Sequence, residues 1–185
     1  MLFRSKIDNL IKGISLFSLG LGKKVLIADS ISLVVNDNYL NYTNLSPEQA
    51  ILTTILYSFQ LYFDFSGYGD MAFGLGHMFN IKIPINFNSP YKSQNIQEFW
   101  ARWHISLSSW FKEYLYFPLG GNRKGVFYTL RNLFLIAFIS GIWHGAGFNF
   151  IVWGLLHGVA LVVHRILKNE RKLKIPKLIS TFITF

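Results

Sequence analysis

Two histidines lie in surroundings that could support chemistry. His104 stands in RWHIS, within a tryptophan-rich stretch. His144 stands in GIWHGAG, where glycines let backbone or substrate approach closely and the indole of Trp143 can exclude water. Because the ordinary pKa of an imidazole is about 6.5, a neutral His144 could accept the proton of a hydroxyl group. A hydrogen bond to a backbone carbonyl inside a membrane would explain His144 equally well, and His104 has the same two interpretations.

The other polar residues are weaker candidates for chemistry. The serines of HISLSSW have no glycine-flanked nucleophile elbow, and GLGKK lacks the spacing of a phosphate-binding loop. Asp64 and Asp70 are separated by glycine-containing sequence, which makes a poor cation cage, and no HExxH motif is present. Structural or interfacial roles are favoured for His77, His157 and His164. We therefore expect no metal site.

Composition indicates a protein surrounded by lipid. Of the 185 residues, 51% are apolar and 15% are charged, against roughly 25% charged in ordinary soluble domains. The net charge of +9 suits either anionic headgroups or nucleic acid. Nucleic-acid motifs are absent and the aromatic residues lie in hydrophobic runs, so we expect no nucleic-acid partner. The lack of cysteine excludes disulfides and thiol nucleophiles.

The first half of the chain predicts two long helices that would position these groups. Residues 13–35 are long enough to span a bilayer but are interrupted by two lysines and an aspartate, so we expect a broken or buried helix. Residues 36–47 are polar and turn-rich. Ser46 followed by Pro47 predicts the N-cap and first residue of the next helix. That helix carries four polar groups that need internal partners: Asp64, Ser66, Asp70 and His77.

The tryptophan-rich segment follows a loop. Residues 82–93 contain two prolines and predict an ordered loop. Asn95 then caps a helix, with Glu98 placed to reach back as in a capping box. We expect one amphipathic helix that ends before Pro118, because bulky side chains recur at helical spacing: Trp100, Trp103, Leu107 and Trp110.

Two apolar runs near the end of the chain predict a membrane hairpin. Residues 126–143 and 148–167 are each long enough to cross about 27 to 30 Å of hydrocarbon. The positive-inside rule makes both outer ends cytoplasmic and puts His144 on the far side, or recessed from it. Residues 178–185 are too short for a span, and no cleaved leader is recognised, so we expect a cut chain. The basic residues at the outer ends of the hairpin are Arg123, Lys124, Arg165, Lys168, Arg171, Lys172, Lys174 and Lys177.

Four segments together resemble a known family: LGLGKKVLIAD, YFDFSGYGDMAFGLGHMF, INFNSPYKSQNIQEFWARWHISLSSWFKEYLYFPLGGNRKG and SGIWHGAGFNFIVWGLLHG. They closely resemble membrane-bound O-acyltransferases of the bacterial alginate O-acetylation type, and D-alanyl transferases acting on teichoic acids are more distant relatives. The resemblance runs from about Leu19 to Gly158, the central portion of such enzymes. It implies an all-α, polytopic transmembrane helical protein with amphipathic and re-entrant helices, in which residues 1–185 are one partial membrane domain.

The resemblance also implies an activity. It implies a multi-pass enzyme of the bacterial inner (cytoplasmic) membrane that moves an acyl group, acetyl for the alginate type, from a cytoplasmic thioester to polysaccharide hydroxyls outside. The donor would be acetyl-CoA or a carrier-protein thioester, with no bound cofactor, and the partners would be the bilayer and extracytoplasmic acetyl-carrying or transferase proteins. His144 would be catalytic and His104 would support it. Candidate substrate-binding or tunnel-lining residues are Trp103, Trp143, Asp64, Asp70, Arg102 and Asn122.

Other interpretations stay open at this point. The same fold could transfer D-alanyl groups or act on peptidoglycan. A channel or transporter component would use Asp64, Asp70 and the histidines to line a permeation route. For Asp64, Asp70, Arg102 and Asn122, a structural role in satisfying buried backbone competes with a role in the donor path. An inactive remnant of a longer reading frame is a further possibility.

Overall fold

The computed structural model describes residues 7–170 and 177–184. Within these ranges every regular element is a helix and no strand occurs, which confirms the all-α prediction. The chain folds as two compact units, residues 1–86 and residues 87–185. The basic positions 171–176 named above lie outside the described residues.

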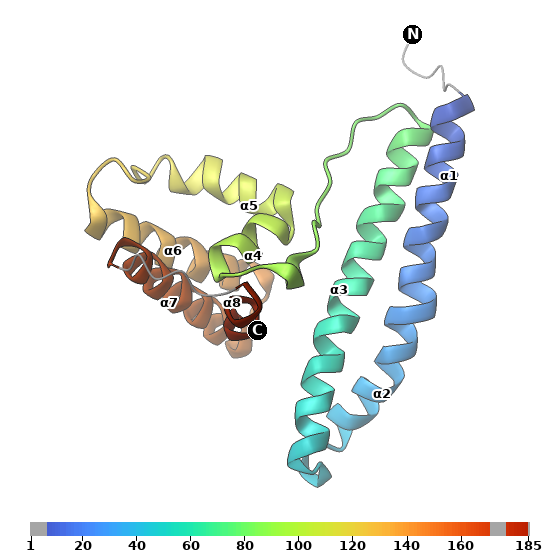
Figure 1. Ribbon diagram of the computed structural model, residues 1–185, viewed down its shortest axis with the longest axis horizontal. Coiled ribbons are helices and arrows are strands. Elements are labelled where there is room, and N and C mark those ends of the chain that lie inside the picture. Colours follow the sequence, from blue (N-terminus) through green and yellow to red (C-terminus); the bar gives the residue numbers. More distant parts are fainter. Residues whose placement is uncertain (1–6, 171–176, 185) are drawn as a thin grey trace. The chain divides into compact units, whose positions relative to one another are not determined.

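The first unit is built on an antiparallel pair of long helices. One side of the pair is α1 (Ile7–Gly22), the π-helical segment η1 (Lys23–Ala28) and α2 (Asp29–Leu40), which run on without a gap. After the short 3-10 helix η2 (Tyr42–Asn44), the chain returns as α3 (Pro47–Met78), and α1 and α3 lie side by side (Figure 1).

The interruption expected in the helix over residues 13–35 lies at the predicted lysines, but it is a π-helical segment and not a gap. The helix continues through the charged stretch with one widened π turn, because its two lysines find carboxylates at the surface of the pair. It also continues to Leu40, into the segment that its polar residues marked as a turn. The start of α3 is as predicted: the Ser46 hydroxyl accepts from the Gln49 N–H, and the Gln49 side chain accepts from the Ser46 N–H.

Glycines set the distance between α1 and α3. Gly20 lies against Gly67 and Gly13 against Gly74, two turns further along both helices. A Cβ at Gly20 would lie 2.6 Å from the Gly67 carbonyl oxygen, and a Cβ at Gly67 would lie 2.7 Å from the Gly20 oxygen. The backbones therefore touch directly at these positions, and no larger residue fits without moving the helices apart.

Three ion pairs of the first unit join the lysines of η1 to carboxylates of α2 and α3. Lys23 Nζ lies 2.5 Å from Asp70 Oδ2, and Lys24 Nζ lies 2.6 Å from Asp64 Oδ1 and 2.7 Å from Asp29 Oδ1. The two pairs to α3 tie it to η1, and Lys24 also ties η1 to the first residue of α2. The widened turn thus lies where the charges meet.

The second unit begins with a loop and two short helices. The loop contains the 3-10 helix η3 (Pro90–Lys92) and leads to α4 (Ile96–Arg102), α5 (Ile105–Phe111) and the π-helical segment η4 (Lys112–Tyr116). The prediction of one helix through this stretch is wrong, because the chain breaks between α4 and α5 at Trp103 and His104. The end of the helical stretch before Pro118 is confirmed.

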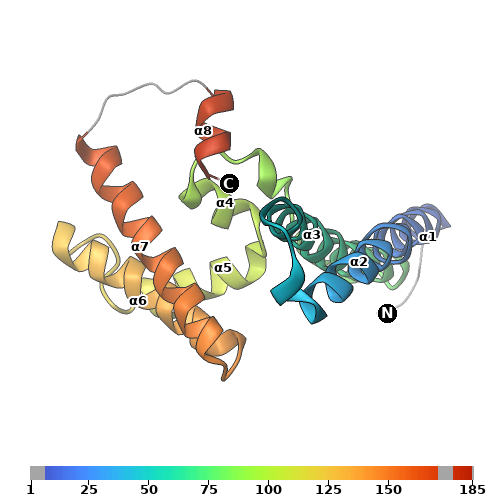
Figure 2. The same cartoon turned by 90° about the horizontal axis from the view of Figure 1, so that it is seen from below.

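A helical hairpin completes the second unit. It consists of α6 (Val126–His144) and α7 (Phe148–Glu170), which lie side by side in both ribbon views, followed by α8 (Lys177–Thr184) (Figure 1 and Figure 2). By length and composition, residues 126–144 and 148–167 could each cross a membrane, with mean hydropathies of 1.5 and 1.8. The sequence prediction of these two runs is confirmed to within one residue.

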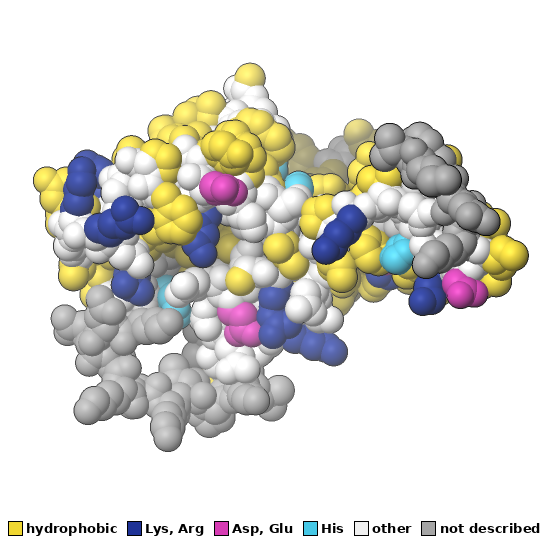
Figure 3. All heavy atoms as spheres, turned by 90° about the horizontal axis from the view of Figure 1, so that it is seen from above, with side chains coloured by type: hydrophobic (Ala, Val, Ile, Leu, Met, Phe, Trp, Pro, Cys, Tyr) yellow, Lys and Arg dark blue, Asp and Glu magenta, His cyan; other side chains and the backbone are white. Residues whose placement is uncertain are grey.

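Much of the surface of each unit is apolar. Figure 3 shows hydrophobic side chains spread over the visible face, and Leu26, Leu40 and Phe127 are 73%, 83% and 73% exposed. Soluble proteins rarely expose so much contiguous apolar area, whereas helices that face lipid do so over most of their length. The surface therefore suits contact with hydrocarbon or with further membrane helices.

Candidate active site

His104 occupies the break between α4 and α5 in a conformation that few side chains adopt. Its backbone has φ 44° and ψ 58°, in the left-handed region, while Trp103 before it is extended. Such a residue costs about 1 to 3 kcal/mol and persists where its surroundings hold it, often at functional sites. The His104 carbonyl oxygen accepts from the Ser108 N–H at 3.0 Å and so begins α5.

Arg102 helps to hold this break in place. Its guanidinium donates to Glu98 Oε1 from Nε at 3.0 Å and from Nη2 at 2.8 Å, and to the Asn88 carbonyl oxygen from Nη1 at 3.1 Å. The Asn88 N–H in turn donates to the Arg102 carbonyl oxygen. Every one of these partners is structural, so the arrangement favours the structural interpretation of Arg102.

The cap of α4 differs in one detail from the predicted capping box. The Asn95 side chain accepts from the Glu98 N–H at 2.8 Å, as expected. Glu98 reaches one residue further than predicted, because its Oε2 accepts from the Gln94 N–H at 2.9 Å. Its other oxygen is then in position for Arg102, so one carboxylate joins the cap to the break.

Trp103 belongs to an aromatic cluster beside His104. Its indole stacks on Phe99 with ring centroids 5.6 Å apart and meets Phe87 edge-on at 5.2 Å. The Phe87 ring also lies 6.4 Å from the imidazole of His104. These contacts restrict both side chains of the break, and Trp103 lies beside His104 as a lining residue would.

His144 ends α6 and is surrounded by aromatic rings. Its imidazole meets Trp153 of α7 edge-on at 5.0 Å and Trp143 at 5.2 Å, and it lies parallel to Phe150 at 6.4 Å. The side chain is nevertheless exposed, and Trp143 is 61% exposed. Within the described chain, the Trp143 indole therefore packs on one edge of His144 only.

The second unit brings the two histidines within electrostatic range of each other. Burial lowers the pKa of His104, and the imidazole of His144 lowers it further. His104 therefore stays neutral at neutral pH and keeps one N–H donor and one acceptor nitrogen. A neutral imidazole with an N–H donor suits the stabilisation of negative charge on a reacting oxygen.

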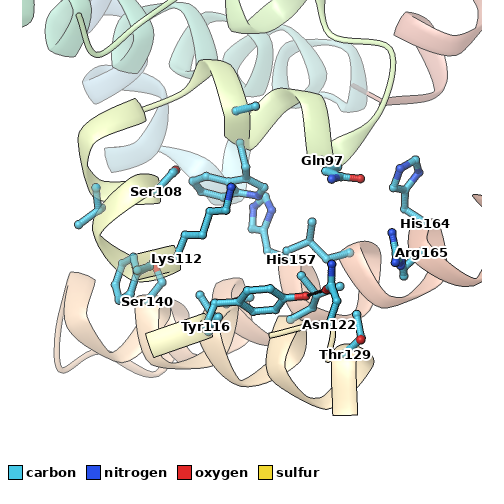
Figure 4. A pocket seen from close by; sticks show the side chains of 18 of the residues that line it. Gln97, Ser108, Lys112, Tyr116, Asn122, Thr129, Ser140, His157, His164 and Arg165 are labelled. Carbon is cyan, nitrogen blue, oxygen red and sulfur yellow. Dashed lines mark hydrogen bonds between the residues drawn. The ribbon is translucent and has the colours of Figure 1, made fainter. Parts of the chain in front are cut away.

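A cavity of about 400 Å³ lies in the same unit (Figure 4). Its wall is mostly apolar and aromatic, with Trp100, Phe111 and Trp153 among its members. His157 lines it and packs against Trp153 at 4.6 Å and Trp100 at 5.2 Å, whereas neither His104 nor His144 is among its lining residues. Trp153 is thus the part of the cavity wall that contacts His144.

Asn122 also lines this cavity, and its surroundings explain its position. The Tyr116 hydroxyl donates to Asn122 Oδ1 in a short hydrogen bond. The loop that carries Asn122 is fixed to α6 by Asn132, which is fully buried and donates to the carbonyl oxygens of Leu119 and Gly121 at 3.3 and 3.2 Å. Asn122 therefore faces a ligand-sized space and has a structural bond as well.

Asp64 and Asp70 lie in the first unit, where each pairs with a lysine as described above. His77, also in that unit, packs on Phe73 at 4.8 Å. Within residues 7–170 and 177–184, no group of three or more His, Asp or Glu side chains could hold a metal ion.

Sequence reasoning underrated three residues of the second unit. All three line the cavity and pack on one another, and Trp153 also contacts His144: they are His157, Trp153 and Trp100. The sequence favoured a structural role for His157. The available signal was the four-residue spacing from Trp153 to His157, which puts both rings on one face of α7. Trp100 contacts them only through the packing of α4 on α7, which the sequence does not reveal.

Known proteins resemble the chain throughout these elements. It is 55% identical over 180 residues to the peptidoglycan O-acetyltransferase of Helicobacter pylori, covering 96% of this chain and 34% of that protein. It is 48% identical over 180 residues to the probable alginate O-acetylase AlgI of Pseudomonas putida, covering 96% and 37%. A teichoic acid D-alanyltransferase of Bacillus subtilis is 37% identical over 125 residues, covering 63% and 31%. The chain thus spans about a third of the length of these curated relatives.

The family assignment rests on the matched range as well as on these relatives. The family model described as MBOAT, membrane-bound O-acyltransferase family, matches residues 9–184. This range includes the break at His104 and the hairpin of α6 and α7, in which α6 ends at His144. The resemblance expected from the sequence motifs is confirmed, and the chain belongs to the membrane-bound O-acyltransferase family.

Proposed function

We propose that this chain forms the central part of an enzyme that transfers an acyl group, acetyl in the first instance, from a cytoplasmic thioester to hydroxyl groups of a polysaccharide outside the membrane. The observation that carries the proposal is that the second unit holds two imidazoles within the matched range, His104 at the left-handed break between α4 and α5 and His144 at the end of α6. Similarity to relatives named for peptidoglycan and alginate O-acetylation supports the choice of acceptor.

The reaction assigns a separate task to each imidazole. His144 accepts the proton of the acceptor hydroxyl while the hydroxyl oxygen attacks the thioester carbonyl carbon. His104 donates a hydrogen bond from its neutral imidazole to the oxyanion that develops on the carbonyl oxygen. When the intermediate collapses, the C–S bond breaks, and the thiolate leaves and takes the proton from His144. The products are the O-acyl ester and the free thiol.

The proposed membrane arrangement agrees with this division of tasks. Arg123 and Lys124 precede α6, and Arg165 lies near the end of the apolar part of α7, so the outer ends of the hairpin are cytoplasmic by the positive-inside rule. His144 then lies at the opposite end of a 19-residue helix, about 28 Å away, where an external acceptor can reach it. The proposed protein is a multi-pass enzyme of the cytoplasmic membrane with extracytoplasmic acyl-handling partners.

A chimera tests the function in a complete enzyme. The matching 180 residues of the Helicobacter pylori peptidoglycan O-acetyltransferase are replaced by this chain, and ester-linked acetate is released from the cell wall by mild base and measured. We expect the chimera to acetylate peptidoglycan. Its His144→Ala variant should lose a factor of about 100 to 10,000 in transfer rate, the usual contribution of a general base. His77→Ala, which removes an imidazole from the other unit, is the matched control.

Retention of O-acetylation by a folded His144→Ala chimera would remove His144 from the mechanism. The corresponding chimera with the Pseudomonas putida alginate O-acetylase decides the acceptor, because activity in one host enzyme and not in the other identifies the polysaccharide that the chain serves. The channel alternative predicts ion flux across vesicles and no ester formation. The lysine partners of Asp64 and Asp70 argue against it, since they neutralise the carboxylates that would line the route.

A further inference from the structure

The cavity of the second unit is elongated along the hairpin. Its lining runs from Thr129 to Ser140 on α6 and from Trp153 to Arg165 on α7, always at spacings of one helical face. At 1.5 Å per residue these stretches extend about 17 Å. The volume of about 400 Å³ falls within the range of roughly 300 to 1,000 Å³ typical of small-molecule sites.

Both ends of the cavity carry polar groups, and they differ in which groups these are (Figure 4). Because α6 and α7 are antiparallel, with Gly141 packed on Gly154, the start of α6 and the end of α7 meet at one end. There lie Thr129, Asn122 and Arg165. Ser108, Lys112 and Ser140 lie toward the other end (Figure 4). The wall between is formed mainly by apolar and aromatic side chains, among them Trp100, Leu107, Phe111, Leu133, Ile136 and Leu161.

The charge of the lining is positive. Lys112 and Arg165 line the cavity, and among its described lining residues there is no Asp or Glu. Figure 4 shows Lys112 extended across the cavity toward His157, while Arg165 lies at the opposite side, near His164 and Gln97. The field of Arg165 also reaches Tyr116: burial raises the pKa of the Tyr116 hydroxyl, and Arg165 opposes that rise.

We propose that this cavity binds an anionic phospholipid, with the phosphate at Arg165 and one acyl chain along the apolar wall beside α6 and α7. The inference takes α6 and α7 to span the bilayer, as in the proposed function. The end of the cavity that holds Arg165 then lies at the cytoplasmic face, where anionic lipids concentrate and basic pockets between membrane helices bind their headgroups. The chain of the lipid lies parallel to the helices, as it does in the bilayer.

The lining favours a lipid over the thioester donor. A donor in this cavity would have to bring its carbonyl carbon to His144 and His104, yet neither imidazole lines it. A bound acyl chain would instead press on Trp100 and His157, whose rings pack on Trp153 and through it on His144. The lipid would therefore support the aromatic packing behind the candidate base without reacting.

Native mass spectrometry of the purified 185-residue chain in detergent tests the site. The probes are dioleoylphosphatidylglycerol and dioleoylphosphatidylcholine, which share acyl chains and differ in net charge. We expect one phosphatidylglycerol to bind in preference to phosphatidylcholine. Arg165→Gln should weaken it about fivefold, given the usual contribution of a cation near the headgroups, and Lys112→Gln, on the opposite side of the cavity (Figure 4), should weaken it less. Arg123→Gln removes an exposed cation that does not line the cavity and should leave binding unchanged.

A second variant separates the cavity from general surface charge. Leu133→Trp keeps every cation but fills the apolar wall, so it should abolish the preference while helix content by circular dichroism stays the same. Equal binding of the two lipids, equal losses in Arg165→Gln and Arg123→Gln, or full binding by Leu133→Trp would each overturn the proposal. Stoichiometric displacement of phosphatidylglycerol by acetyl-CoA would overturn it as well, by assigning the cavity to the donor. None of these readouts depends on acyl transfer, so the proposed function can fail independently.

Discussion

The close contact between α1 and α3 makes a quantitative prediction for two glycines of the first unit. In Gly67→Ala the new Cβ would lie 2.7 Å from the Gly20 carbonyl oxygen and 3.2 Å from the Lys24 N–H nitrogen. The helices must open by roughly 0.7 Å to restore ordinary contact distances. Gly22, two residues beyond Gly20, has nothing within 4 Å of its would-be Cβ, so Gly22→Ala is a matched control in the same helix pair.

The two variants share one contribution to stability and differ in the other. Replacing a helical glycine by alanine stabilises either variant by about 1 kcal/mol through backbone propensity. Gly67→Ala also carries a packing cost of about 1 to 3 kcal/mol for overfilling a close contact. We therefore expect Gly67→Ala to be about 1 to 3 kcal/mol less stable than Gly22→Ala.

Equilibrium unfolding by sodium dodecyl sulfate in mixed micelles, followed by circular dichroism at 222 nm, measures this difference. Gly20→Ala, whose Cβ would meet the Gly67 carbonyl oxygen at 2.6 Å, should behave like Gly67→Ala. If Gly67→Ala proves as stable as Gly22→Ala, the backbones of α1 and α3 do not touch at this point and the antiparallel register of the pair is wrong.

Three further predictions concern the second unit. Asn132→Ala removes two hydrogen bonds that a fully buried side chain donates to loop carbonyls, and it should lower the free energy of unfolding by about 1 to 3 kcal/mol. The readout is faster proteolysis of residues 117–125. Asn132→Asp is the conservative comparison. Trp153→Ala in the chimera removes the ring between His144 and His157 and should lower kcat by about 10- to 100-fold with little change in KM. Trp153→Phe should keep most of the activity. A change in KM alone would contradict a positioning role for Trp153. Burial lowers the pKa of His104 below its ordinary 6.5, so the unfolded chain binds more protons than the folded chain as pH falls below about 6.5. Tm should therefore fall between pH 7.5 and pH 5.5, and it should fall less in His104→Asn. Equal slopes of Tm against pH in the two proteins would contradict this. Asn is the choice there because it tolerates the left-handed backbone.

Locally encoded features were predictable from the sequence. The start of α3 follows from Ser46 and Pro47, because the cap and the proline act within one turn. The hairpin of α6 and α7 follows from the length of two apolar runs and from the glycines between them. Both are signals that need no knowledge of distant residues.

The break at His104 was hidden because the spacing of the bulky side chains continues across it. Trp100, Leu107 and Trp110 keep a helical period, while the left-handed conformation of a non-glycine residue has no signature in sequence. The network that holds it runs through Arg102 to Asn88, fourteen residues earlier, so it appears only once the loop has folded back.

The π turn at Lys23–Ala28 was hidden for a similar reason. Its lysines looked like interruptions of a membrane helix, because their carboxylate partners on α3 lie about forty residues further along the chain. The identity of the candidate catalytic pair was available from the RWHIS and IWHG motifs. The cavity was not, since it depends on how α4 and η4 pack against α6 and α7.

The π turn in the first unit also determines where this part of the chain can lose a single residue. A π turn holds one more residue than an α turn, so losing a single residue between Lys23 and Ala28 would restore ordinary winding. Because the wider turn covers about the same rotation as an α turn, everything before the deletion would keep its orientation relative to everything after it. Gly13 and Gly20 would still face α3, whereas a residue lost elsewhere in α1 or α2 would rotate one side by about 100°. Homologous chains should therefore tolerate a single-residue gap within Lys23–Ala28 better than one elsewhere in this helix.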